Sequence, residues 1–299
     1  MGPPTVPPAR PSRLRGQIYA LAAVLCWSTA GILQRQVSAG AGDQLVGRAL
    51  FALFALLLLS AASQDSRAPA AVRSLASPAG LLVAVGLATA SGSFIIALNH
   101  TSVAHALVFQ ALTPLVAGLL ALLLLGEHLT LSGWLAISLA AVGVLLMAGP
   151  GGGGLLGDGM AALSPTAFAI VIVVARRHRR ISMAPATCLA EAILVLGGLP
   201  FIHPDQITSI DLLWLALLGV GQQGVGLILF TRAARMLSAA SMGLIVLLEP
   251  VLGSLWAWLG TAERPAATTL AGGGVVIAAV LVKQWADRSA TGNDPLATP

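Results

Sequence analysis

The chain has 299 residues, of which 57% are hydrophobic and 9% are charged, and its mean hydropathy is +0.90. Roughly a quarter of the residues of a soluble globular protein are charged, so this composition excludes a soluble domain of comparable size. The net charge of +5 comes from basic residues that lie between the apolar runs, which is a membrane-topology pattern. We therefore expect the lipid bilayer as a partner, and no nucleic acid.

Apolar runs bounded by turn residues or charges predict ten helices that cross the membrane. About 20 apolar residues suffice for one crossing, so the chain is long enough for ten helices with short loops. In chain order, the predicted helices cover residues 17–34, 44–62, 79–98, 102–125, 131–148, 156–175, 184–202, 211–230, 238–260 and 266–285. Backbone groups without hydrogen bonds are costly in lipid, so the predicted fold is an all-α integral membrane protein.

The two halves of the chain resemble each other at an offset of 136 residues. Pro114 pairs with Pro250, and each proline is followed 13 residues later by a glutamate, Glu127 or Glu263. Five crossings in each half would insert the second half upside down, and inverted repeats are a hallmark of secondary transporters. The predicted organisation is a tail at 1–16, a first five-helix repeat at 17–148, a Gly-rich connector at 149–155, a second five-helix repeat at 156–286 and a tail at 287–299.

The ten-helix topology puts most of the 16 basic residues on one side of the membrane. The positive-inside rule makes that side the cytoplasm, so we expect a multi-pass protein of the cell membrane with both termini cytoplasmic. A composition rich in Arg, Ala and Gly, with Lys283 as the single lysine, indicates a bacterial source.

The most specific sequence pattern runs from Ala97 through Leu-Thr-Pro at 112–114 to Gly-Glu at 126–127, with a second copy from Leu-Glu-Pro-Val at 248–251 to Glu-Arg at 263–264. Together with Trp27-Ser28 and Arg48, this pattern resembles the drug/metabolite transporter superfamily, specifically its ten-helix EamA-type members, over about residues 19–282. The resemblance implies two inverted five-helix repeats, a central cavity and transport of amino acids or other small organic solutes. The small four-helix multidrug relatives handle protons with a glutamate in helix one. This chain has no acidic residue there, so the resemblance does not extend to proton-coupled drug export.

Glu249 is the first candidate for a substrate or proton site, because it lies within the ninth apolar run. An ionised carboxylate at that depth costs about 2.5–3.5 kcal/mol, so it must face a cavity, find a partner or be protonated. A structural alternative is a hydrogen bond to backbone groups near Pro250. Pro250 cannot donate to the carbonyl of Val246, and Pro114 likewise leaves the carbonyl of Gln110 unpaired. Both prolines are therefore predicted to break their helices, either beside a transport site or as packing kinks.

Arg48 and Glu191 occur in similar local contexts in the second helix of each half. Inverted topology predicts Arg48 toward the outer side of the membrane and Glu191 toward the inner half, so we expect no salt bridge between them. We interpret Arg48 as a snorkelling or interhelical residue, with a transport role as the alternative. Glu191 is a weaker candidate for transport.

His105 lies well inside the fourth apolar run, and we interpret it as an interhelical hydrogen bonder rather than a proton relay. Uncharged polar residues within the apolar runs could line a cavity, although each is also explained as a contact between helices. These residues are Gln110, Gln222, Gln223, Ser28, Thr29, Ser91 and Ser93.

The leading hypothesis is a secondary carrier that moves a small organic metabolite by alternating access, with export favoured over import. No Walker-type loop occurs in the sequence, so a gradient, such as one of protons, or exchange for a counter-solute would supply the energy. The alternatives are a membrane-embedded enzyme for a lipophilic substrate and a passive channel. No metal-spaced cluster and no nucleophile with an evident base supports an enzyme. We expect no cofactor or metal, and a monomer or a homodimer.

Overall fold

The computed structural model describes residues 13–62, 75–126, 131–147, 154–178, 181, 183–234, 236–237, 242, 245–246, 248–261 and 264–292. Within these ranges the chain forms helices joined by short turns, and no strand is present. The first half contributes α1 (Arg13–Ser28), α2 (Ala30–Gln36), α3 (Ala41–Ala62), α5 (Pro78–His100), α6 (Val103–Gln110), α7 (Thr113–Leu125) and α8 (Leu131–Met147). The second half contributes α9 (Gly154–Arg177), α10 (Met183–Gly198), the 3-10 turns η1 (Leu199–Phe201) and η2 (Pro204–Gln206), α11 (Ser209–Ala216), η3 (Leu217–Val225), α12 (Gly226–Ala234), α14 (Leu248–Thr261) and α15 (Ala267–Gly292).

Seven helical stretches are long and apolar enough to cross a membrane: Leu14–Gln36, Ala41–Leu58, Pro78–His100, Val103–Leu125, Gly154–Ala175, Met183–Phe201 and Ser209–Ala233. Two shorter apolar segments, Trp134–Gly143 and Ala267–Ala279, lie where the fifth and tenth helices are predicted. α14 covers the second part of the predicted ninth helix, whose residues 238–241, 243–244 and 247 lie outside the described ranges. The predicted all-α membrane fold is confirmed.

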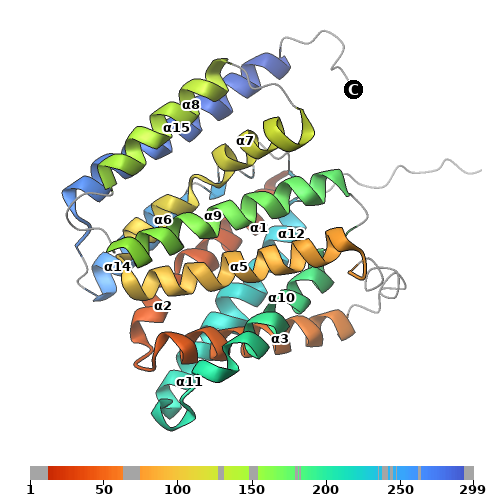
Figure 1. Ribbon diagram of the computed structural model, residues 1–299, viewed down its shortest axis with the longest axis vertical. Coiled ribbons are helices and arrows are strands. Elements are labelled where there is room, and N and C mark those ends of the chain that lie inside the picture. Colours follow the sequence, from red (N-terminus) through yellow and green to blue (C-terminus); the bar gives the residue numbers. More distant parts are fainter. Residues whose placement is uncertain are drawn as a thin grey trace, which may run out of the picture.

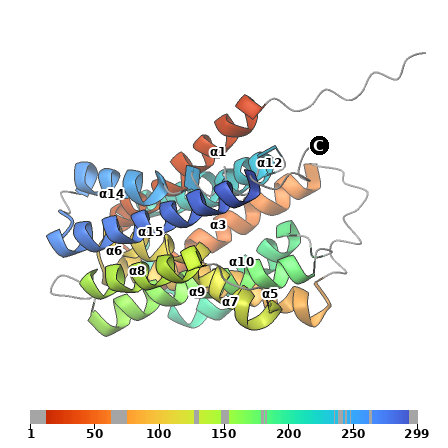
Figure 2. The ribbon, with the colours of Figure 1, turned by 90° about the horizontal axis from the view of Figure 1, so that it is seen from above.

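Helices of the two halves pack against each other as related pairs. α3 packs on α10, α6 on α14 and α8 on α15, so each lies against the helix that holds the same place in the other half. α5 packs along α9, and α12 packs along α1. These two contacts are equivalent, because each joins the third crossing of one half to the first crossing of the other. Figure 1 shows α8 and α15 side by side at one edge of the bundle, with α3 and α10 toward the opposite edge. Turned by 90°, the helices share one general direction, which we take as the direction of crossing (Figure 2).

The paired helices run in opposite directions. Gly86 in the middle of α5 lies against Val171 of α9, whereas Gly157 near the start of α9 lies against His100 at the end of α5. Five crossings in each half require this antiparallel packing, and the predicted inverted arrangement is confirmed.

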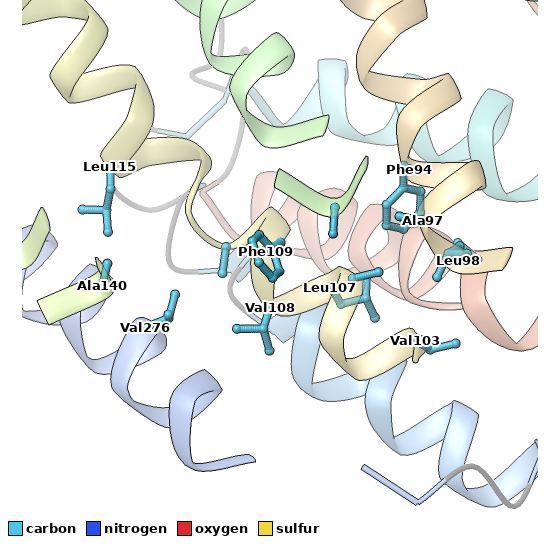
Figure 3. Packing of buried hydrophobic residues seen from close by; sticks show 14 of the residues in the cluster. Phe94, Ala97, Leu98, Val103, Leu107, Val108, Phe109, Leu115, Ala140 and Val276 are labelled. Atoms are coloured by element: carbon cyan, nitrogen blue, oxygen red, sulfur yellow. The ribbon is translucent and has the colours of Figure 1, made fainter. Parts of the chain in front are cut away.

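The largest cluster of buried apolar side chains lies where α5, α6 and α9 meet α8, α14 and α15. Figure 3 shows Phe94 of α5 and Phe109 of α6 within this cluster, and Val276 of α15 near its other end. Large apolar side chains such as Leu123 and Leu270 are instead exposed on the surface of the bundle. An apolar exterior of this kind is suited to contact with lipid chains.

Hydrogen bonds tie the two halves together at one end of the bundle. The buried carboxylate of Asp211, in the first turn of α11, accepts from the backbone N–H of Ser38 at 2.7 Å and from its hydroxyl at 2.9 Å. The same carboxylate accepts from the backbone N–H and hydroxyl of Thr208, which completes the capping box of α11. Nearby, Oδ1 of Asp43 accepts from the backbone N–H of His203 at 2.6 Å.

The fourth crossing is interrupted around Pro114, because α6 ends at Gln110 and α7 begins at Thr113. The carbonyl of Gln110 is not unpaired, contrary to expectation, since the hydroxyl of Thr113 donates to it at 2.7 Å. Pro250 lies in the first turn of α14, where a helix tolerates the missing backbone donor.

Candidate functional site

The eighth crossing contains the π-helix η3 between α11 and α12. π-helical turns are rare and occur frequently at functional sites. Gly219 allows η3 to lie directly against α3, since a Cβ there would be 2.6 Å from the carbonyl oxygen of Arg48. The consecutive side chains of Gln222 and Gln223 both reach toward α3 from this turn.

Arg48 is buried, with 4% of its surface exposed, and donates to three side chains. Nη1 donates to the hydroxyl of Ser91 on α5 at 2.8 Å, and Nη2 donates to Oε1 of Gln223 at 2.7 Å. Nη2 and Nε also lie 3.3 and 3.4 Å from Oε1 of Gln222. The guanidinium is therefore held among neutral oxygens between helices, and it does not snorkel to an interface.

Glu191 joins the same set of side chains through Gln223. Its Oε1 accepts from Nε2 of Gln223 at 3.1 Å, and its Oε2 is buried without a hydrogen-bond partner. Gln223 therefore bridges Glu191 and Arg48, which form no direct ion pair. As expected, no salt bridge joins the two residues. Inverted topology predicted them toward opposite sides of the membrane, whereas the structure brings both into contact with one side chain, Gln223.

The crossing of α3 and α10 explains why the two residues meet. The helices hold equivalent places in the two halves and pack in opposite directions, with Gly198 against Val46 and Leu194 in one cluster with Ala49. Residues near the middle of two such helices come together where the helices cross, whichever direction each helix runs through the membrane. We call the resulting set of polar side chains the central cluster: Arg48, Ser91, Glu191, Gln222 and Gln223.

His105 and Gln110 both face α9 and lie outside the central cluster. His105 is fully buried, its Nε2 is 2.9 Å from Oδ1 of Asp158, and its ring lies 5.1 Å from that of Phe109. Oε1 of Gln110 accepts from the hydroxyl of Ser164 at 3.3 Å. These contacts join a helix of the first half to a helix of the second half.

Glu249 lies in the first turn of α14 and is partly exposed. One turn later on the same face, Gly253 lies against Leu107 and the backbone of Ser28. Trp256 donates its indole N–H to the hydroxyl of Ser28 at 3.1 Å. The face that carries Glu249 is thus turned toward α1 and α6, and the hydrogen bonds of the central cluster do not include it.

Asp158, Ser164 and Asp211 are polar contacts that the sequence candidates omit. Asp158 and Asp211 precede long apolar runs, so they resemble ordinary polar residues at helix ends. Asp211 and Ser38 lie 173 residues apart, and the sequence carries no signal for their contact.

The central cluster offers one cation, one carboxylate and several amide and hydroxyl groups at the interface of the two halves. Groups of this kind bind and orient a polar solute by hydrogen bonds and charge. In the part of the chain that the structure describes, no group of three His, Cys, Asp or Glu side chains is placed to hold a metal ion.

Comparison with known proteins agrees with this architecture. A family model described as EamA-like transporter family matches residues 14–149 and again residues 155–283, one match in each half. No curated protein matches significantly. One solved crystal structure, described only as that of a protein, matches with a TM-score of 0.62 and 21% identity, and the match covers 93% of this chain and 99% of the other. At this identity the likeness shows a shared fold.

Proposed function

The chain belongs to the EamA-like transporter family, and on this premise we propose that it is a secondary carrier. It moves a small organic metabolite, an amino acid or a related solute, by alternating access between its two inverted halves. The central cluster carries this proposal, because Arg48 and Ser91 come from the first half whereas Glu191, Gln222 and Gln223 come from the second. A solute bound among them contacts both halves, as a carrier that exposes one site to each side in turn requires.

The burial of charge supports a binding role for this cluster. Charged side chains within a membrane are costly, and they mark substrate or ion pathways more often than packing contacts. Arg48 and Glu191 are 4% and 1% exposed, so both carry this cost in full. Apolar side chains of the same size would hold α3 against α10 at lower cost.

The proposed setting of the carrier is the cell membrane, with both termini in the cytoplasm and export as the working direction. The distribution of basic residues supports this orientation. A proton gradient or exchange for a counter-solute supplies the energy.

Counterflow in proteoliposomes, with a mixture of isotope-labelled amino acids as the probe, tests the proposal. Arg48→Met removes the charge and the hydrogen-bond donors and keeps an unbranched side chain. Hydrogen bonds that involve a charged group contribute about 1.5–3 kcal/mol each, so we expect counterflow to fall by at least about tenfold. Arg232→Met, at an exposed position of α12, is the matched control, and Glu249→Gln tests the second carboxylate in the same assay.

Three results would contradict parts of this proposal. Counterflow of Arg48→Met at the rate of the unmodified protein would remove the central cluster from the mechanism. Flux without saturation would indicate a channel, and conversion of the label into a new compound would indicate an enzyme.

A further inference from the structure

Glu191 carries the one oxygen of the central cluster that lacks a hydrogen bond. Its Oε1 accepts from Gln223 at 3.1 Å, while Oε2 is buried and unpartnered. By contrast, the nitrogens of Arg48 all donate to neighbouring side chains. An unsatisfied buried carboxylate oxygen costs free energy, so the cluster is incomplete at this atom.

Few groups face this carboxylate from the elements packed around α10. α3 presents Arg48, and α10 itself presents the thiol of Cys188. α5 presents the neutral hydroxyl of Ser91, which is bonded to Arg48. η3 contributes only amides, and η1 (Leu199–Phe201) has no titratable side chain. Arg48 is therefore the single charge facing Glu191 within the described ranges.

The enclosure of Oε2 limits what can bind there. Glu191 is 1% exposed, and a solute molecule would need the surrounding helices to separate. A proton needs no cavity. Within the described ranges, three other titratable side chains are as buried as Glu191: His105, Asp211 and Asp43. His105 has Asp158 at 2.9 Å, and Asp211 accepts from Ser38 and Thr208. Asp43 also has an unpartnered oxygen, but its other oxygen accepts from the backbone of His203 at the end of the bundle, outside the central cluster.

We propose that Glu191 is the proton-binding site of this protein and couples proton movement to the solute. This inference rests on the proposed carrier function. Water on one side of the membrane supplies the proton, which forms an O–H bond at Oε2 and leaves to water on the other side. No electrons move.

Charge balance links the proton to the solute. Protonation of Glu191 removes the negative charge that faces Arg48, so the buried guanidinium then favours an anionic group of the solute. One proton and one solute carboxylate together leave the net charge of the central cluster unchanged. The two ligands are therefore carried in the same direction. An inward proton gradient drives this pair into the cell, so in this inference the proton-driven direction is uptake, and export requires a solute concentration inside that exceeds the proton gradient.

Proteoliposomes with an imposed pH gradient and a mixture of labelled amino acids test this inference. For one proton per cycle, a gradient of one pH unit raises the accumulation of label by about tenfold. In Glu191→Gln, which keeps an acceptor for Gln223, we expect the ratio of accumulation with the gradient to accumulation without it to fall to about one, whatever rate of exchange remains. Asp205→Asn, at an exposed position in η2, is the matched control and should respond like the unmodified protein.

Each outcome separates the proton site from the carrier. An unchanged gradient response in Glu191→Gln overturns the assignment of the proton site. Counterflow by the unmodified protein that does not change with the pH gradient also overturns it. In both cases the proposed carrier function is unaffected. Absence of counterflow in the unmodified protein counts against the carrier instead.

Infrared difference spectroscopy then tests the site without any solute. Acidification should produce a carboxylic-acid C=O band that Glu191→Gln lacks and that Glu191→Asp shifts. If Glu191→Gln does not fold, the Glu191→Asp spectrum decides, and an unshifted band overturns the assignment.

Discussion

Replacing Asp211 by alanine tests whether one carboxylate holds the two halves together at an end of the bundle. The change removes the acceptor of four donors, the backbone N–H and hydroxyl of Ser38 and of Thr208. A hydrogen bond to a charged acceptor contributes about 1.5–3 kcal/mol, and an N-cap contributes about 0.5–2 kcal/mol. Because these bonds share one carboxylate at the end of the bundle, they are not additive, and we expect a total loss of about 2–4 kcal/mol.

Thermal unfolding in detergent, followed by tryptophan fluorescence, measures this loss. For a chain of this length the expected fall in Tm is about 3–6 °C. Asp205→Ala, in the same connection but exposed, should change the stability by less than about 0.5 kcal/mol.

A double-mutant cycle with Ser38→Ala separates the contact between the halves from the helix cap. If the Ser38 hydroxyl bonds to Asp211, the double variant should lose about 0.5–1.5 kcal/mol less than the sum of the single variants. Full additivity, or an Asp211→Ala variant as stable as the unmodified protein, would refute the reasoning.

Three further substitutions have expected outcomes in the same unfolding assay. Gly219→Ala puts a Cβ 2.5 Å from that of Phe51 and should cost about 1–3 kcal/mol, whereas Gly221→Ala, with nothing within 4 Å, should be tolerated; equal stability of the two would contradict the close packing of η3. Thr113→Val leaves the Gln110 carbonyl without its 2.7 Å donor and should cost about 1–3 kcal/mol, while an unchanged Tm would mean that this carbonyl needs no partner. Trp256→Phe removes the 3.1 Å bond to Ser28 and should cost about 0.5–1.5 kcal/mol, a loss that should vanish when Ser28→Ala is already present.

Composition and periodicity were enough to predict the scaffold, because each crossing must satisfy its own backbone and bury its own apolar length. That constraint is local, so apolar runs in the sequence predict where the helices lie. The antiparallel pairing of the two halves follows from counting five crossings in each. The repeat around Pro114 and Pro250 also indicates which residues of the two halves correspond.

The arrangement of polar side chains was less predictable, because it depends on where distant helices cross. Arg48, Glu191, Gln222 and Gln223 are all conspicuous in the sequence as polar residues within apolar runs. Their assembly depends on the angle between α3 and α10 and on the π-helical turn of η3, and neither leaves a local signal. Glu249 was the first candidate from sequence because its burial cost is evident there, yet its helix faces α1 and α6.

The bundle is duplicated, but its polar centre is not. At the offset of 136 residues, Gln222 and Gln223 correspond to Gly86 and Leu87, which carry no polar side chain. Two identical halves that exchanged conformations would give inward-open and outward-open forms of equal free energy, and neither direction would be preferred at rest. Glutamine side chains confined to one half remove that degeneracy, so the resting protein should favour one orientation even when both compartments have the same composition.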